Sequence, residues 1–431
     1  MSGSERRRGA GGFTKDLQYY KFCAYGFLKN LRFYEPFLML FFLDKGLTYA
    51  QIGGLYAARE IFINLTEIPS GLMADTLGRR LTMVISFLAY IVAFVIFFAA
   101  EVYLLLFFAM AFYAFGDAFR TGTHKAMIFD YLASRGWDHL KAHYYGHTRS
   151  WSQRGAALSA LIAAALVFRQ GSYAPIFLFT IIPYTLDLIL IMSYPKNLDG
   201  PRQTSDRTVA DEFRHVFRSL AKSMRNPAAL RAISNQALYT GFYKAAKDYL
   251  QPILQTFAVG LPVLVALATQ ERTAIIIGIV YSLLYLLTAG ASRRSGRLAD
   301  RFGNLAAPLN STLLIGVTFG ILSGVAHWLT VSGIAIALYI GIYILENLRK
   351  PMGIAYVTER MDKDSLASAL SVESQAETLF AAAIALLLGG LSSLLGLGPG
   401  LILVSAMCGI VGLIIRLPAD PAREADLKIE K

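Results

Sequence analysis

Charged residues are scarce in this sequence, since Asp, Glu, Lys and Arg together make up 16% of its 431 residues. A typical soluble domain has about a quarter of its residues charged. Cysteine is also rare: Cys23 and Cys408 both lie in apolar stretches, and they do not form a paired zinc-binding spacing. These shortages exclude an intrinsically disordered chain, a disulfide-stabilised scaffold, a zinc finger and an ordinary cytosolic enzyme.

Motifs for catalysis and nucleotide binding are missing as well. The sequence has no glycine-rich loop ending in Gly-Lys-Ser or Gly-Lys-Thr, so we do not expect ATP to drive its activity directly. It has no nucleophile elbow, and we therefore expect neither an enzyme nor a bound cofactor. His139, His143 and His147 recur every four residues, which favours a solvated helix face over a metal-binding or pH-sensing stripe.

Long apolar runs dominate the rest of the chain. Hydrophobic residues make up 55% of the sequence, and its mean hydropathy is +0.48. A membrane-spanning helix needs about 20 apolar residues, and a backbone exposed to lipid must satisfy its hydrogen bonds within the segment. The sequence therefore predicts an all-α membrane protein with twelve transmembrane helices. The predicted spans are 17–43, 48–71, 80–100, 102–131, 143–168, 173–194, 231–258, 272–295, 305–326, 329–358, 365–393 and 397–417.

The charge distribution predicts the topology. The formal net charge of +12 comes mainly from cations in loops that would share one side of the membrane with the N-terminus. By the positive-inside rule we expect both termini in the cytoplasm of a multi-pass cell-membrane protein, in the inner membrane if it is bacterial. This explains the basic charge without nucleic acid as a partner. The predicted organisation is a cytoplasmic tail (1–16), a six-helix half (17–194), a cytoplasmic linker (195–230), a second six-helix half (231–417) and a cytoplasmic tail (418–431).

The linker carries apolar residues at helical spacing among basic ones. They are Phe213, Val216, Phe217, Leu220 and Met224. This pattern predicts an amphipathic helix that lies on the cytoplasmic leaflet. The alternative is a regulatory or partner-binding segment.

The two predicted halves share a pattern of residues. The segment 71–80 after the second span matches 296–304 after the eighth. Internal repeats of this kind are typical of secondary transporters, whose substrate site lies at the repeat interface. Two further matches, in the same order, pair Asp117, Arg120, Ala126 and Asp130 with Glu346, Arg349, Ala355 and Glu359, and Gly26, Phe27, Lys29, Arg32 and Tyr34 with Gly241, Phe242, Lys244, Lys247 and Tyr249.

The sequence resembles the major facilitator superfamily over its whole length. The most specific element is a loop motif of the type G-x-x-A-D-x-x-G-R-R at 71–80, of which 296–304 is a degenerate copy. The resemblance implies a monomer with two pseudo-symmetric six-helix halves. It also implies alternating access around a central site that is lined by the first, fourth, seventh and tenth spans.

The same resemblance implies a gating role for the loop motif. In the family, its aspartate and arginine join an acid at the end of span 4 and stabilise the outward-open state. Asn304 replaces the expected basic residue of the second copy, so we expect a weaker ionic contact there. The alternative is that these loops only fix the topology. The gating residues are Gly71, Asp75, Gly78, Arg79 and Asp130 in the first half and Gly296, Asp300 and Glu359 in the second.

Basic residues outnumber acids on the four spans that should line the site. The cations are Lys29, Arg32, Arg120, Lys125, Lys244, Lys247, Arg349 and Lys350, and the acids are Glu35, Asp117, Asp248 and Glu346. A charge at mid-bilayer costs about 2.5–3.5 kcal/mol, so these residues must pair or bind something. Residues three apart share a helix face, which is the spacing of Lys29 with Arg32 and of Lys244 with Lys247. The pattern predicts an anionic substrate, a carboxylate or a phosphate. Its predicted ligands are Lys29, Arg32, Arg120, His124, Lys244, Lys247 and Arg349.

Internal pairing is the alternative interpretation of these charges. It would leave Lys29 and one lysine of span 7 as the strongest substrate ligands. The pairs would be Asp117–Arg120, Glu346–Arg349, Glu35–Arg32, and Asp248 with Lys247 or Lys244.

Acidic residues on the second and eleventh spans are candidates for proton coupling. A carboxyl group buried away from water favours its neutral form and can carry a proton. The candidates are Glu60, Glu373 and Glu377. The alternative is a structural bridge from Arg149 or Arg154 to Glu373 or Glu377 that breaks as the site opens.

These patterns predict a secondary active transporter, a symporter or antiporter, that moves a small organic anion by alternating access with a proton as coupling ion. Sodium coupling or substrate exchange would also fit. One alternative is a proton-coupled multidrug efflux pump for cationic or neutral lipophilic compounds. Another is a sensor or lipid-handling protein built on the transporter fold. The expected partners are the small-molecule substrate, the coupling ion and the lipid bilayer.

Overall fold

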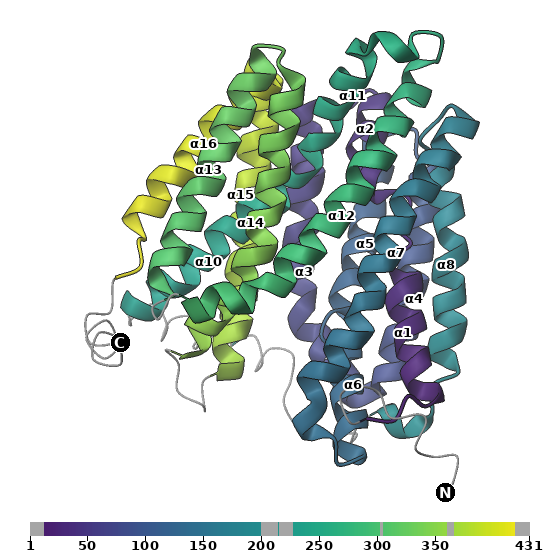
Figure 1. Ribbon diagram of the computed structural model, residues 1–431. Helices are drawn as coiled ribbons and strands as arrows, with labels where there is room; N and C mark the ends of the chain where they lie inside the picture. Colours follow the sequence, from purple (N-terminus) through teal and green to yellow (C-terminus); the bar gives the residue numbers. More distant parts are fainter. Residues whose placement is uncertain (1–12, 200–213, 215–226, 302–304, 360–365, 419–431) are drawn as a thin grey trace, which may run out of the picture. The chain divides into compact units, whose positions relative to one another are not determined.

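The computed structural model describes residues 13–199, 214, 227–301, 305–359 and 366–418. In this part of the chain the regular structure is helical, as the sequence predicts (Figure 1). The chain forms two compact units, and α3 (Tyr49–Leu77) and α12 (Thr269–Arg301) contribute residues to both. The first unit is built from Met1–Phe37, Phe62–Val209 and Ile277–Tyr285, and the second from Leu38–Ile61, Ala210–Ile276 and Leu286–Lys431.

The first unit is a group of helices around an aromatic core. Besides its parts of α3 and α12 it contains α1 (Leu17–Lys29), η2 (Glu35–Phe37), α4 (Arg79–Ala99), α5 (Tyr103–Arg120), α6 (Thr123–Ser134), η3 (Asp138–Leu140), α7 (Lys141–Gln170), α8 (Pro175–Met192) and η4 (Lys196–Asp199). Helix α4 packs against α5 and α8, and α1 packs against α7 and α8. Between α4 and α8 the ring centroids of Phe94 and Tyr184 are 4.9 Å apart, and those of Phe97 and Phe177 are 5.0 Å apart. Aromatic side chains bury large areas, which explains their place in this core.

The second unit packs α10 against α15, and α13 against both α14 and α16. Its core includes Ile233, Leu309, Met352, Tyr356 and Val372, which come from four different helices. Besides its parts of α3 and α12 it contains α2 (Leu38–Asp44), α10 (Pro227–Ala246), η5 (Lys247–Tyr249), α11 (Leu250–Gly260), η6 (Pro262–Leu264), α13 (Ala306–Trp328), α14 (Ser332–Glu359), α15 (Leu366–Leu395) and α16 (Leu397–Ile414).

Nine helices in the described part of the chain are long and apolar enough to cross a membrane. Among them, α4 and α8 agree within a few residues with the predicted spans 80–100 and 173–194. The predicted spans 17–43, 48–71 and 231–258 are helical over most of their length but are not among these nine, so the count of twelve stays a prediction.

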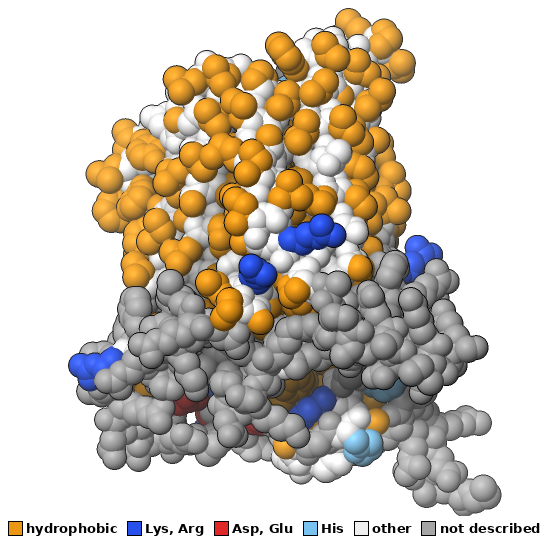
Figure 2. Space-filling model, turned by 90° about the vertical axis from the view of Figure 1, so that its left-hand side faces the viewer, with side chains coloured by type: hydrophobic (Ala, Val, Ile, Leu, Met, Phe, Trp, Pro, Cys, Tyr) orange, Lys and Arg blue, Asp and Glu red, His pale blue; other side chains and the backbone are white. Residues whose placement is uncertain are grey.

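The outer surface of the second unit is apolar. Helices α13 and α16 expose large hydrophobic side chains, among them Ile315, Leu322, Met407 and Ile410. Figure 2 shows a face on which hydrophobic side chains cover most of the described surface, with isolated Lys or Arg side chains among them. A continuous apolar surface of this kind suits lipid rather than water. The protein is therefore a multi-pass membrane protein.

Three predicted spans are broken rather than continuous. Helix α1 ends at Lys29, α5 ends at Arg120, and α10 ends at Ala246, and each is followed by a turn or short helix. After α5, Gly122 has a φ of 86°, a conformation that suits glycine. The last turn of each of these three helices carries a cation, Lys29, Arg120 or Lys244. The negative end of the helix dipole lowers the cost of keeping a cation there.

Two glycines allow α3 and α15 to touch within the second unit. A Cβ added at Gly389 would lie 2.5 Å from the carbonyl oxygen of Tyr49, and one added at Gly53 would lie 2.4 Å from that of Ala385. Backbone atoms cannot move aside as a flexible side chain can. The neighbouring Gly390 is different, because a Cβ there would meet no described atom within 4 Å.

We expect Gly389→Ala to be less stable than Gly390→Ala by about 1–3 kcal/mol, because the added methyl group would force α3 and α15 apart. Both substitutions gain the same helix propensity, about 1 kcal/mol, so their difference isolates the steric cost. The unfolding midpoints of the two purified variants measure it. Equal midpoints would show that this glycine contact does not hold the two helices together.

Candidate functional site

Four charged residues cluster at the breaks of α1 and α5 in the first unit. We call Lys29, Arg32, Asp117 and Arg120 the Lys29 cluster. A nitrogen of Arg120 lies 2.7 Å from a carboxylate oxygen of Asp117, and a nitrogen of Arg32 lies 3.6 Å from an oxygen of Glu35. Each pair is three residues apart on the chain: Asp117 and Arg120 share a face of α5, whereas Arg32 and Glu35 lie at the two ends of a turn before η2. These two pairs confirm two of the four pairs in the internal-pairing alternative.

Lys29 differs from the two arginines because it has no such partner. Its side chain is 7% exposed, and it forms no hydrogen bond or ion pair with any described residue. The charged residues whose fields act on it are Arg120, Arg32, Asp117 and Glu35. Lys29 is thus a buried cation among other charges, with its own hydrogen-bonding capacity unused.

Tyrosine side chains surround the Lys29 cluster. The Tyr90 hydroxyl donates to Asp117 over 2.7 Å and lies 3.2 Å from Nε of Arg120. The hydroxyls of Tyr34 and Tyr113 are 3.1 Å apart. Tyr90 holds the Asp117–Arg120 pair in place, because it bonds to both members at once.

His124 lies beside the cluster but faces aromatic rings. Its ring stacks on Tyr25 with 3.6 Å between centroids, and its Nε2 lies 3.3 Å from the hydroxyl of Tyr194. The hydroxyl of Tyr25 is buried and has no hydrogen-bond partner in the described structure. In this arrangement the His124 ring holds the Tyr25 ring in place. The group left without a hydrogen bond is the Tyr25 hydroxyl and not the His124 imidazole.

Asp187 on α8 was missed by the sequence analysis. It is 0% exposed, and neither of its carboxylate oxygens has a hydrogen-bond partner among the described residues. The charges whose fields act on it are Lys29 and Arg120. The available signal was a lone acid within the apolar run Leu186–Met192, since an ionisable residue inside a span is a functional candidate by default.

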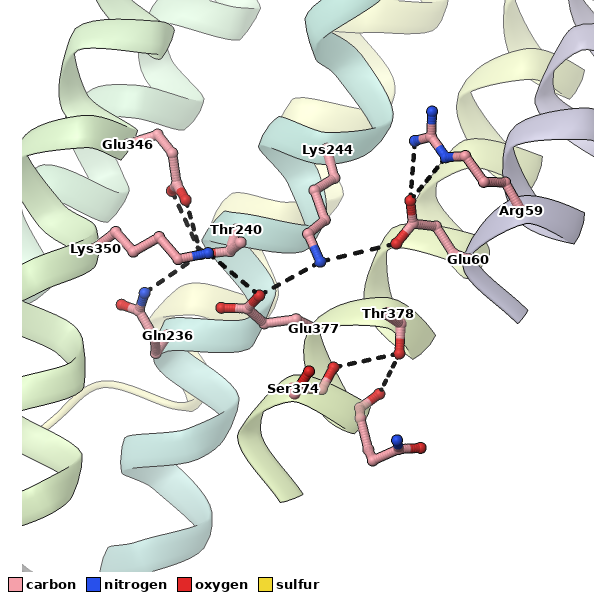
Figure 3. Close-up of polar contacts among 11 residues, drawn as sticks. Arg59, Glu60, Gln236, Thr240, Lys244, Glu346, Lys350, Ser374, Glu377 and Thr378 are labelled. Carbon is pink, nitrogen blue, oxygen red and sulfur yellow. Dashed lines mark hydrogen bonds and ion pairs between the residues drawn. The ribbon is translucent and has the colours of Figure 1, made fainter. Parts of the chain in front are cut away.

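A second charged network lies within the second unit (Figure 3). We call Arg59, Glu60, Lys244, Lys350 and Glu377 the Lys244 network. Lys244 Nζ lies 3.4 Å from Glu377 and 3.8 Å from Glu60, so one ammonium joins two carboxylates. Arg59 pairs with Glu60 at 2.9 Å, and Lys350 pairs with Glu377 at 3.5 Å. The network therefore brings together a predicted substrate ligand and two predicted proton-coupling residues.

Lys247 lies outside this network. Its Nζ is 3.4 Å from Asp248, as the alternative interpretation of the charges predicted. Lys244 and Lys247 therefore each have an acidic partner within their own unit.

Glu373, the third candidate for proton coupling, also lies outside the Lys244 network. It is 4% exposed, and its Oε1 has no hydrogen-bond partner in the described structure.

The predicted pair Glu346–Arg349 is wrong. Glu346 accepts a hydrogen bond from Thr240 at 3.1 Å. Arg349 is fully buried and donates to backbone carbonyl oxygens of Asn235, at 2.8 Å, and of Leu309. A guanidinium group has five N–H donors in a planar fork, so it can bond to carbonyl groups on two other helices at once, although its Nε has no hydrogen-bond partner in the described structure. Arg349 thus connects three helices. These contacts do not support its prediction as a substrate ligand.

Of the contacts predicted for the loop motif at 71–80, the structure shows the one between its arginine and the acid at the end of span 4. Arg79 and Asp130 form an ion pair, whereas Asp75 is exposed at the end of α3. Gly78 makes the turn with a φ of 94°. A Cβ added at Gly71 would meet no described atom within 4 Å, so no close helix contact explains this glycine.

The beginning of α4 has an additional acidic partner. The N-cap residue Gly78 has no side chain to cap the helix, and Asp199 supplies the missing acceptor: its carboxylate takes the N–H of Arg80 at 3.0 Å. An acid at the positive end of a helix is favourable.

Several predicted features fall outside what the structure describes. The surroundings of Gly296 and the side chains of Asp300 and Glu359 lie outside the described structure, so the second copy of the loop motif stays a prediction. The amphipathic segment 213–224 also lies outside the described residues, apart from the backbone of Arg214. His139, His143 and His147 are exposed, and the described part of the chain contains no group of three residues that could hold a metal ion.

Apolar helices, breaks within spans and buried charges at these breaks are typical of a membrane transporter. Comparison with protein families agrees with this class. The chain belongs to the Major Facilitator Superfamily, whose family model matches residues 22–372.

Solved transporter structures share the fold. A variant of the nucleoside transporter NupG has a TM-score of 0.73 and 14% sequence identity, with 94% of this chain and 99% of that chain covered. A POT family transporter in complex with a thioalcohol-conjugated peptide has a TM-score of 0.71 and 15% identity, with 95% and 97% covered. A POT family transporter in complex with 5-aminolevulinic acid has a TM-score of 0.70, 15% identity and the same coverage of 95% and 97%. No curated protein sequence matches the chain significantly.

Proposed function

We propose that this transporter moves a small organic anion, a carboxylate or a phosphate ester, by alternating access and with a proton as the coupling ion. The observation that supports this most is the unused ammonium of Lys29, which is buried and has no hydrogen-bonding or ionic partner among the described residues. Burying a cation without a partner is costly. An anionic substrate would remove that cost each time it binds.

Two further donors beside Lys29 are unused. Nε of Arg32 and the hydroxyl of Tyr25 are buried and have no hydrogen-bond partner in the described structure. The fields of Arg32 and Arg120 act on Tyr25 as well as on Lys29, so these groups belong to one region of the first unit. An ammonium, a guanidinium N–H and a hydroxyl suit a carboxylate or phosphate, which accepts several hydrogen bonds at once.

The coupling proton is proposed to travel on a carboxyl group, and Glu60, Glu373 and Glu377 are the candidates from the sequence. All three are buried. Glu60 and Glu377 share Lys244, so protonation of either acid would release one side of the bridge. Such a release would link proton binding to a change of contacts within the second unit.

We expect Lys29→Ala to weaken anion binding about 10- to 150-fold, since a hydrogen bond to a charged group contributes about 1.5–3 kcal/mol. The measurement is the unfolding temperature of the purified protein with lactate, benzoate, glycerol 3-phosphate and lipophilic cations. A ligand at about 100 times its Kd stabilises by about 2.7 kcal/mol, which is enough to detect.

Lys21→Ala is the matched control, because Lys21 lies on the same helix and its ammonium donates to the carbonyl oxygen of Ser193 at 2.7 Å. It should bind the anions as the wild type does. Stabilisation by lipophilic cations alone would instead favour multidrug efflux. Ligand binding without any flux in reconstituted vesicles would favour a sensor.

A further inference from the structure

We infer that Asp187 carries the coupling proton and that its protonation makes Lys29 available to the anion. This inference rests on the proposed anion site. It assigns the proton-coupling residue to α8 in the first unit, whereas the sequence predicted proton-coupling residues on the second and eleventh spans.

The first reason is the environment of the Asp187 carboxyl group. The side chain is 0% exposed, and both oxygens lack hydrogen-bond partners in the described structure. Of the buried acids described here, Asp248 and Glu373 each have one oxygen without a hydrogen-bond partner, whereas Asp187 has two. An ionised carboxylate without hydrogen bonds is costly to bury, so such a group must take up a proton or a cationic partner.

The second reason is the set of groups that face Asp187. Lys29 at the end of α1 and Arg120 at the end of α5 are the charges that act on it. The hydroxyls of Tyr25 on α1 and Tyr194 after α8 also lie within its field. Helices α4 and α7 pack against α8 as well, but no charged group from either acts on Asp187 in the described structure.

Arg120 is already committed to Asp117 and Tyr90, whereas Lys29 has no partner. Lys29 is therefore the cation that Asp187 can neutralise. The neighbouring candidate Glu373 differs in this respect, because two other carboxylates, Glu377 and Glu346, act on it together with Lys350.

The third reason is the charge balance of the site. The charges beside Asp187 are those of Lys29 and Arg120, and Arg120 pairs with Asp117, so this group is neutral when both Asp117 and Asp187 are ionised. A proton on Asp187 leaves one uncompensated positive charge, at Lys29. An anion of single charge then restores neutrality, so the anion and the proton enter together. No bond is made or broken in this step except the O–H bond of the Asp187 carboxyl group.

Anion affinity in relation to pH tests the coupling. Above the pH at which Asp187 loses its proton, the wild-type Kd should rise about tenfold per pH unit, because each bound anion then requires the uptake of one proton. Asp187→Asn has the same size and stays neutral, so its Kd should not change with pH beyond the titration of the anion itself. Asp187→Glu retains an ionisable group and should keep the pH dependence. The exposed Asp44 supplies the control Asp44→Asn, which should behave as the wild type.

Infrared difference spectra test the proton site without any substrate. The carbonyl stretch of a protonated carboxyl group should titrate in the wild type and in Lys29→Ala, and Asp187→Asn should lack that band. If the band is unchanged in Asp187→Asn, or if the pH dependence of anion binding persists in it, the inference is overturned. If the band is lost but none of lactate, benzoate and glycerol 3-phosphate binds the wild type, Asp187 is the proton site and the proposed anion function fails.

Discussion

Arg349→Ala is expected to destabilise the protein by about 3–5 kcal/mol, because it removes the hydrogen bonds of a large buried side chain and leaves a cavity in its place. The Arg349 side chain is 0% exposed. It connects α14 to α10 through the backbone and side-chain oxygens of Asn235, and to α13 through the carbonyl oxygen of Leu309. Its guanidinium carbon also lies 5.3 Å from the ring centroid of Tyr239. Removing the side chain would leave buried carbonyl groups without donors, at about 1–3 kcal/mol each, and a cavity between three helices.

The unfolding midpoint of the purified variant in detergent measures this loss. Arg349→Lys should recover only part of it, because a single ammonium cannot reproduce the planar fork that reaches two helices. Arg294→Ala is the control, since Arg294 is an exposed arginine in the same unit and should change the stability by about 0.5 kcal/mol or less. A wild-type midpoint for Arg349→Ala would show that these hydrogen bonds do not hold the three helices together.

Arg349 also shows the limit of the sequence pattern. The rule that an intramembrane arginine needs polar partners was correct, and the spacing of three residues to Glu346 suggested a partner on the same helix. The actual acceptors belong to Asn235 on α10 and Leu309 on α13, which lie 114 and 40 residues away along the chain. Periodicity within a helix cannot identify such partners, because they depend on how separate helices pack.

Local patterns were more informative elsewhere. The ends of α4 and α8 follow from the lengths of their apolar runs, and the pairs Arg32–Glu35, Arg120–Asp117 and Lys247–Asp248 join residues close in sequence. Breaks after Lys29 and Arg120 were not predicted, since hydropathy averages over a short turn inside an apolar segment. Asp187 has no charged neighbour on its own helix, so no spacing between charges marked it, although a single acid in an apolar run is itself unusual.

Lys244→Met is expected to cost about 3 kcal/mol, because it removes the cation that joins two buried acids. The side chains of Glu60 and Glu377 are 5% and 9% exposed, so water compensates little for the loss. Each acid keeps one other partner, Arg59 or Lys350, which places the expected cost at the lower end for a broken buried pair. The unfolding midpoint measures it. A loss below about 1 kcal/mol would mean that the bridge contributes no more than a surface ion pair does.

Neutral variants of the two acids separate the two candidate sites of proton coupling. Adding Glu60→Gln and Glu377→Gln to Lys244→Met should not restore the lost stability, since it also removes an acidic partner of Arg59 and of Lys350; the non-additivity measures the coupling energy. Proton-driven uptake by the triple variant in vesicles, kept below its unfolding temperature, is then decisive. If uptake still responds to a pH gradient, neither Glu60 nor Glu377 carries the proton, which agrees with Asp187 as the coupling residue. If the response is lost while anion exchange continues, the proton travels on the Lys244 network, and Asp187 only sets the charge around Lys29.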